Sequence, residues 1–210
     1  MVQVPLAVAV TRAEFEVLNV IVLKKMCRAG TVAEVLATPP AVVENTVASL
    51  ERSDLIGRAD ELLLPTDAAE PAVVSFTAEA YRDLRSDAES DALYERFERI
   101  NVQLLQTMAE WQQIDIGGHK VGNDHSDRDY DEKIITKAAR LVERLKPIAG
   151  ALGERDPRFL RYGERLDAAL NRVDLGERDY LSSPMLESVH NIWFEFHEDL
   201  LRALGRARTE

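Results

Sequence analysis

The sequence predicts a mainly α-helical protein with a small β-hairpin wing, and three observations support this. Apolar residues recur at intervals of three and four in many segments, which is the period of an amphipathic helix. Residues that favour helix starts, such as Thr11 and Asp156, stand before such segments. Residues 55–65 read instead as two short strands around a turn. We expect two domains, residues 1–85 with the hairpin and residues 86–210 as a helical bundle.

The first helix is expected to begin after Thr11 and to end at Gly30, because threonine suits an N-cap and glycine suits a helix end. Its apolar stripe consists of Phe15, Leu18, Val22 and Met26. Residues 2–10 before it are apolar, and we expect a strand or an arm that packs on the body or on a partner chain.

A second, short helix is expected after Thr31, because Glu34 three residues later completes a capping box. Thr38-Pro39-Pro40 then forms a turn, since proline ends one helix and can begin the next. The third helix is expected over residues 40–52, with an inward face made of Val43, Val47 and Leu50.

The two strands of residues 55–65 would turn near residues 59–61, and another helix is expected to begin at Thr77. Two short helices across a sharp turn, followed by a hairpin, make a helix-turn-helix with a wing. Such a unit usually places its second short helix in a DNA major groove.

The segment TVAEVLATPPAVVENTVASLERSDLIGR (residues 31–58), followed by the hairpin and by FTAEAY, resembles the winged helix-turn-helix domain of MarR-type bacterial regulators. The resemblance covers about the first 85 residues. It implies binding to double-stranded DNA through the third helix and an arginine on the wing. The implied DNA-binding residues are Ala41, Glu44, Asn45, Thr46, Ser49 and Arg52 on the helix and Arg58 on the wing.

The charge of the chain opposes this interpretation. The net charge is −11, both halves are acidic, and Glu44 and Glu51 would lie near DNA phosphates. Two hypotheses therefore stay open. One is a DNA-binding transcription regulator whose helical domain dimerises and senses an effector. The other is a protein-interaction or accessory protein that does not bind DNA.

Residues 91–111 are expected to form a long helix, which either pairs with its twin in a homodimer or is buried in a bundle. Its apolar stripe consists of Leu93, Phe97, Ile100, Leu104, Met108 and Trp111. Residues 112–132 are expected to form a long polar loop. Its alternating aspartates resemble a calcium loop, but Glu132 stands where an EF-hand needs glycine, so we expect no metal site.

Further helices are expected over residues 132–149, after Asp156-Pro157, and after Ser183-Pro184. Two of them carry basic stripes, which could bind an anion or could pair with acidic groups. These stripes are Lys133, Lys137, Arg140 and Arg144 on one helix and Arg158, Arg161, Arg165 and Arg172 on the next.

The last helix places His190, Phe194, His197 and Leu201 on one face. The two histidines are about 10 Å apart along the axis, so they cannot share one metal ion. They are either hydrogen-bonded core residues or part of a small-molecule pocket, for which the candidates are Trp111, His125, Asp127, His190, Trp193 and His197.

The segments NDHSDRDYDEK, RYGERLDAALNRVDLG and SPMLESVHNIWFEFHEDLL resemble a helical segment at the C-terminal end of some bacterial proteins related to pyruvate phosphate dikinases. The resemblance covers about residues 110–205. It implies an accessory or sensing domain tied to phosphoenolpyruvate or pyruvate metabolism. The catalytic domains of those enzymes have no counterpart here, so no catalytic residue is carried over.

The chain contains no GxSxG, P-loop, GxGxxG or CxxC motif, so we expect neither an enzyme nor a cofactor. Its one cysteine, Cys27, excludes an internal disulfide and fits a cytoplasmic protein. No run of residues reaches the length of a membrane span.

Overall fold

The computed structural model describes residues 8–207 and divides into two compact units. The first unit contains residues 8–86 and 197–207, and the second contains residues 87–196. Residues 197–207 were predicted to belong to the second domain, but they pack with the first unit. The expected N-terminal strand or arm lies mostly outside the described residues.

The first unit contains helices α1 (Arg12–Lys24), α2 (Ala29–Leu36), α3 (Pro40–Arg52), α4 (Ala69–Ala80) and α5 (Arg82–Arg85). The bounds predicted for the third helix are confirmed, and so is its inward face, because Val43, Val47 and Leu50 are fully buried. Ala37 ends α2 in the left-handed conformation, and Pro40 begins α3 after a short turn.

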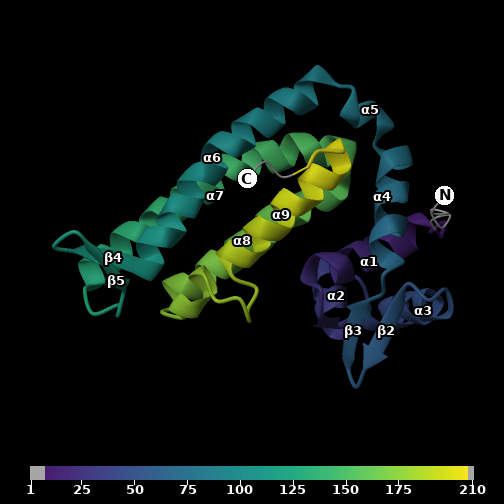
Figure 1. Ribbon diagram of the computed structural model, residues 1–210, viewed down its shortest axis with the longest axis horizontal. Helices are drawn as coiled ribbons and strands as arrows, with labels where there is room; N and C mark the ends of the chain where they lie inside the picture. The colour runs from purple at the N-terminus through teal and green to yellow at the C-terminus, as the bar shows by residue number, and fades with distance from the viewer. Residues whose placement is uncertain (1–7, 208–210) are drawn as a thin grey trace. The chain divides into compact units, whose positions relative to one another are not determined.

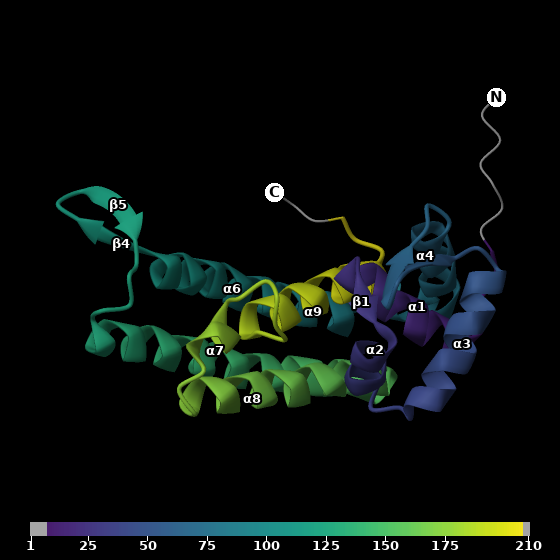
Figure 2. The same cartoon turned by 90° about the horizontal axis from the view of Figure 1, so that it is seen from below.

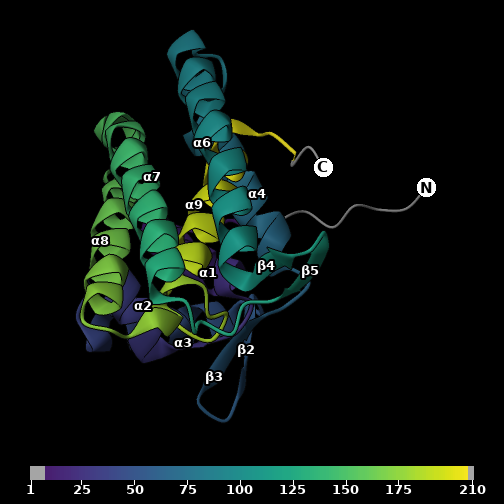
Figure 3. The same ribbon diagram turned by 90° about the vertical axis from the view of Figure 1, so that its left-hand side faces the viewer.

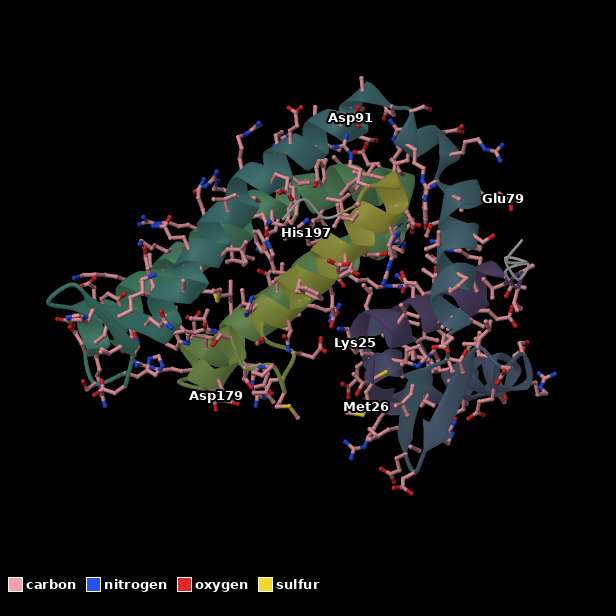
Figure 4. All side chains as sticks on the ribbon, viewed as in Figure 1. Lys25, Met26, Glu79, Asp91, Asp179 and His197 are labelled. Atoms are coloured by element: carbon pink, nitrogen blue, oxygen red, sulfur yellow. The ribbon has the colours of Figure 1, made fainter. Side chains whose placement is uncertain are left out.

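The predicted boundary between the first two helices was wrong. Helix α1 ends at Lys24, because Lys25 adopts a φ of 62° and turns the chain out of the helix. Met26 is 53% exposed rather than part of the buried stripe (Figure 4). The backbone then forms strand β1 (Cys27–Arg28), and α2 begins at Ala29, before the expected Thr31 cap.

The hairpin prediction is confirmed, and the hairpin belongs to a three-stranded antiparallel sheet. Strands β2 (Ile56–Ala59) and β3 (Leu62–Pro65) pair with Arg58 opposite Leu63, and β1 adds to the other edge of β3. Asp60 takes a φ of 55° in the two-residue turn, as such turns require. The hairpin projects beyond α1, α2 and α3 of its unit (Figure 3).

The core of the first unit forms around α1. Phe15 on α1 stacks on Phe76 of α4 with ring centroids 4.2 Å apart. The side-chain nitrogen of Asn19 donates to Asp199 at 2.9 Å, so the C-terminal segment closes this core. The prediction that a helix begins at Thr77 was wrong. Thr77 lies inside α4, where its buried hydroxyl donates to the carbonyl of Val74.

The second unit consists of long helices that lie side by side (Figures 1 and 2). They are α6 (Ala88–Gln112), α7 (Arg128–Arg155), α8 (Leu160–Asp174) and the first half of α9 (Val189–Leu204), with 3₁₀ turns η1 (Pro157–Phe159) and η2 (Arg178–Leu181). The inward stripe predicted for residues 91–111 is confirmed, because all six of its residues are buried. Within residues 8–207, no helix has both the length and the apolar character needed to cross a bilayer.

The expected polar loop at residues 112–132 is instead largely a second hairpin. Strand β4 (Gln113–Ile116) pairs with β5 (His119–Gly122) between α6 and α7 (Figure 2). Gly117 and Gly118 form its turn with φ values of 62° and 87°. A turn with two positive φ angles favours glycine, and this pair of glycines was the signal for the hairpin.

The predicted start of the last helix was wrong. Helix α9 begins at Val189, where the hydroxyl of Ser188 accepts from the backbone N–H of Asn191, rather than at Ser183-Pro184. Of the four residues predicted to share one face, His197 and Leu201 are buried, whereas Phe194 is 40% exposed. The buried apolar residues of α9 are Val189, Ile192, Trp193, Phe196, Leu200, Leu201, Ala203 and Leu204.

Replacing Phe97 with alanine should destabilise the second unit by about 3–5 kcal/mol, because this fully buried ring contacts both Trp193 and Phe196. Urea unfolding followed by tryptophan fluorescence checks this, since both tryptophans lie in that unit. The matched control is Arg96→Ala on the same helix, at an exposed position, which should change stability by less than about 0.5 kcal/mol. Equal effects of the two substitutions would contradict the assigned core.

Candidate nucleic-acid interface and ligand site

The outer face of α3 is open to solvent. Its exposed residues are Ala41, Val42, Glu44, Asn45, Ala48 and Arg52. Asn45, one of the predicted DNA-binding residues, is therefore accessible from solvent. The Nε atom of Arg52 donates to the carbonyl of Ala48 at 3.1 Å, and its side chain carries the only positive charge on α3.

Arg58 on the hairpin points back at α3 instead of away from it. Its Nε atom donates to Glu51 at 2.9 Å, and one of its terminal nitrogens contacts Glu44 at 3.3 Å. These two carboxylates, Glu51 first, hold the pKa of Arg58 above its usual range. The wing arginine expected in a DNA minor groove is thus engaged by the two α3 glutamates expected to oppose DNA binding.

Two other candidates on α3 make contacts within the protein. The hydroxyl of Ser49 donates to Glu14 on α1 at 2.8 Å, so it faces the core side of α3 rather than an approaching base. The hydroxyl of Thr46 donates to the carbonyl of Val42 one turn earlier.

Glu14 is a positioning residue that the sequence analysis did not connect with α3. Its carboxylate accepts from the backbone N–H of Thr11 at 2.9 Å and from Ser49 on α3. The Thr11 backbone hydrogen bond, followed by the Ser49 hydroxyl, lowers the pKa of Glu14 below its usual range. The Thr11–Glu14 spacing signals a capping box, but only the tertiary structure shows that the same carboxylate also holds α3.

The surface formed by α3 and the hairpin is close to neutral. Beside Arg52 and Arg58 it carries Arg28 on β1, which pairs with Glu61 at 3.2 Å. Glutamates and aspartates on the same elements outnumber these arginines, and they are Glu44, Glu51, Asp60 and Glu61.

The ligand candidates do not form one pocket. Trp111 and His125 do lie together, with ring centroids 4.3 Å apart. Trp193 instead donates to Asn101 at 3.0 Å, ten residues or about 15 Å along α6 from Trp111.

The other three candidates have separate roles in the structure. Asp127 caps α7 by accepting from the backbone N–H of Tyr130 at 3.0 Å. His190 is partly buried, and this burial lowers its pKa. His197 is buried and belongs to the first unit.

The carboxylate of Asp131 connects several segments at one end of the second unit. The sequence predicted this residue only as one of the alternating aspartates of a calcium-like loop. Asp131 is 0% exposed. It contacts Nδ1 of His125 at 3.1 Å, accepts from the side chain of Asn123 at 3.1 Å and accepts from Arg178 at 2.6 Å. Its position one turn before the buried Ile134 and Ile135 was the available signal.

Two hollows lie along α6 and α7 in the second unit. One has a volume of about 260 Å³ and is lined by residues of both helices, and the other, of about 770 Å³, adds the β4–β5 hairpin and the loop after it. In the described part of the chain, no group of three or more histidine, cysteine, aspartate or glutamate residues is placed to hold a metal ion.

The comparisons with known proteins identify no relative. No protein-family model, no curated protein and no solved structure matches the chain.

Replacing Glu14 with glutamine should weaken the attachment of α1 to α3 by about 1 kcal/mol at neutral pH, because charged hydrogen-bond acceptors are the stronger ones. A carboxylate whose pKa is lowered by folding stabilises the protein above its unfolded pKa and loses this effect as pH falls through its folded pKa. The difference between wild type and variant should therefore shrink below about pH 4.3.

Native-state amide hydrogen exchange of α1 and α3 measures this difference locally. Glu34→Gln on α2 is the matched control, because Glu34 is exposed and its side chain makes no hydrogen bond or ion pair with any described residue. A pH-independent difference for Glu14→Gln would contradict the assignment of the effect to the carboxylate.

Proposed function

We propose that the first unit is a winged helix-turn-helix that binds double-stranded DNA, with α3 in the major groove and the β2–β3 hairpin beside it, in a transcription regulator. The observation that carries this proposal is the turn at residues 37–39. This turn joins α2 to an exposed α3, and α3 is followed directly by the projecting hairpin.

The sheet supports the same proposal. The elements follow in the order α1–β1–α2–α3–β2–β3, and the short β1 between the first two helices pairs with β3. This pairing fixes the hairpin to the base of the helical part of the unit. A hairpin held in this way can contact DNA on one side of α3 while its turn stays exposed.

The charges determine how such binding would work. Arg58 can reach a phosphate or the minor groove only if it leaves Glu44 and Glu51, which then remain near the DNA. Each retained carboxylate repels phosphate and reduces the electrostatic contribution that usually dominates affinity. We therefore expect moderate affinity, with most of the salt dependence coming from Arg52 and Arg58.

We propose a homodimer because DNA sites of helix-turn-helix proteins are usually read by two copies. Helix α6 offers an apolar surface for this, since Val102 and Leu105 are 63% and 53% exposed and lie three residues apart on one face. A dimer would set two α3 helices about one turn of DNA apart, roughly 34 Å. An effector bound to the second unit could change that spacing.

A second candidate function is docking of a protein partner on the same α3 surface. The observation that favours it is the Glu44–Arg58–Glu51 cluster, which neutralises the arginine that DNA binding would use. An accessory protein of a metabolic enzyme would need no basic face.

Arg52→Ala should weaken DNA binding and reduce the slope of log affinity against log salt by about 1, because it removes one phosphate contact. Glu44→Gln combined with Glu51→Gln should strengthen binding several-fold, because it removes repulsion and releases Arg58. Fluorescence anisotropy with a labelled duplex from upstream of the protein's own gene, at two salt concentrations and against a scrambled duplex, measures both effects.

Arg82→Ala and Glu79→Gln are the matched controls, since both residues are exposed and lie outside α3 and the hairpin. They should bind as the wild type does. If the wild type and the double glutamine variant both fail to bind at low salt, DNA binding is excluded and docking of a protein partner on α3 becomes the preferred function.

A further inference from the structure

The two basic stripes of the second unit have different surroundings in the structure. Arginines of the stripe on α8 and η1 form ion pairs with nearby carboxylates. Arg165 contacts Glu187 and Glu195, Arg172 contacts Glu177, and Arg158 contacts Asp156. Burial alone would lower the pKa of Arg165, but the two carboxylates raise it overall. The charges of Arg158, Arg165 and Arg172 are therefore already paired within the protein.

The stripe on α7 is largely free of such pairs. Lys137 contacts Glu110 at 2.5 Å. Arg144 donates to Gln103 at 2.7 Å, which is a neutral partner. Among the described residues, neither Lys133 nor Arg140 has an ion-pair partner. The α7 stripe therefore keeps most of its positive charge in a chain whose net charge is −11.

These cations border a groove formed by the two hollows. The smaller hollow is lined by Arg140, Arg144 and Lys137 from α7, with Gln103 and Gln106 from α6, and Glu110 is its one carboxylate. Arg140 and Arg144 are four residues apart, so their side chains leave the same face of the helix about 6 Å apart. Two guanidinium groups at this spacing suit a phosphate or a carboxylate, which arginine can bind with two parallel hydrogen bonds.

The larger hollow continues the groove, because Gln106, Glu110 and Lys137 line both. It adds apolar surface from Ile114 and Ile134. It also adds three aspartates, Asp115, Asp124 and Asp127, which outnumber the two lysines that it adds, Lys120 and Lys133. These carboxylates disfavour a second anionic group there, so an occupant of both hollows should have its negative charge at the arginine end.

Contacts already present hold the walls of the larger hollow. The hydroxyl of Tyr130 on α7 donates to the carbonyl of Glu110 on α6 at 3.0 Å. The backbone N–H of Asn123 donates to the carbonyl of Gln112 at 2.9 Å, so the end of the hairpin is fixed to the end of α6. A volume of about 770 Å³ is in the range of small-molecule sites, and a preformed site loses little entropy on binding.

We propose that this groove binds a small organic oxyanion. Its phosphate or carboxylate group would lie between Arg140 and Arg144, and its uncharged part would extend along α7 toward Ile114 and Ile134. The site lies entirely in the second unit, so a negative result for DNA binding would leave this proposal unchanged.

Isothermal titration calorimetry of the full chain at constant ionic strength tests the proposal with three probes: phenyl phosphate, hexanoate and inorganic phosphate. We expect saturable binding of phenyl phosphate or hexanoate, and the tighter of the two identifies the oxyanion. Phenyl phosphate should bind more tightly than inorganic phosphate, because only the ester also contacts the larger hollow.

Arg140→Gln combined with Arg144→Gln should weaken binding about tenfold or more. The matched control is Arg155→Gln combined with Arg172→Gln, which removes the same charge from arginines of this unit that are exposed but already paired. The side-chain amide signal of Gln103 in ¹⁵N-resolved spectra should shift on binding. Absence of saturable binding at millimolar concentration, or equal binding by the two double variants, would overturn the proposal.

Discussion

The end of the second unit depends on one buried charge, the carboxylate of Asp131. A buried carboxylate is costly unless hydrogen bonds compensate it, and three side chains do so here. Asn123 and His125 come from the loop after the β4–β5 hairpin, and Arg178 comes from η2. The carboxylate of Asp131 therefore connects the start of α7 with this loop and with η2. Asn123 also donates to the carbonyl of Trp111, which extends the network to α6. Asn123 also lines the larger hollow, so this network fixes one wall of the proposed ligand groove.

The first unit shows how a fold and its charge can favour different functions. The proposal of DNA binding rests on its helices, turn and hairpin, yet the Arg58 side chain is held by Glu44 and Glu51 on α3, the helix proposed to enter the groove. Ion pairs this exposed contribute little to stability. Their main effect is on the field at the surface, where they cancel a positive charge that phosphate would otherwise meet.

The local elements were the most predictable part of the molecule. The span of α3 follows from a proline at its start and three apolar residues at helical spacing, and no distant contact changes it. The end of α1 was not predictable from nearby residues. After Lys25 the chain forms β1, and β1 pairs with β3, which lies about 36 residues later in the chain. The ligand candidates failed to converge for a similar reason. Spacing places Trp193 on α9, but only packing decides that it faces Asn101 and not Trp111.

The return of the chain's last segment to the first unit affects the order of folding. Asn19 and Asp199 are 180 residues apart in sequence, and the backbone carbonyls of Arg202 and Ala203 accept from Arg85. Contacts of such long range form late, since the intervening chain must first be synthesised and closed into a loop. During translation, α1 is therefore complete before the end of α9 has been synthesised. Until then, the side chain of Asn19 lacks its hydrogen-bond acceptor Asp199. A fragment cut after residue 86 would remain in that incomplete state.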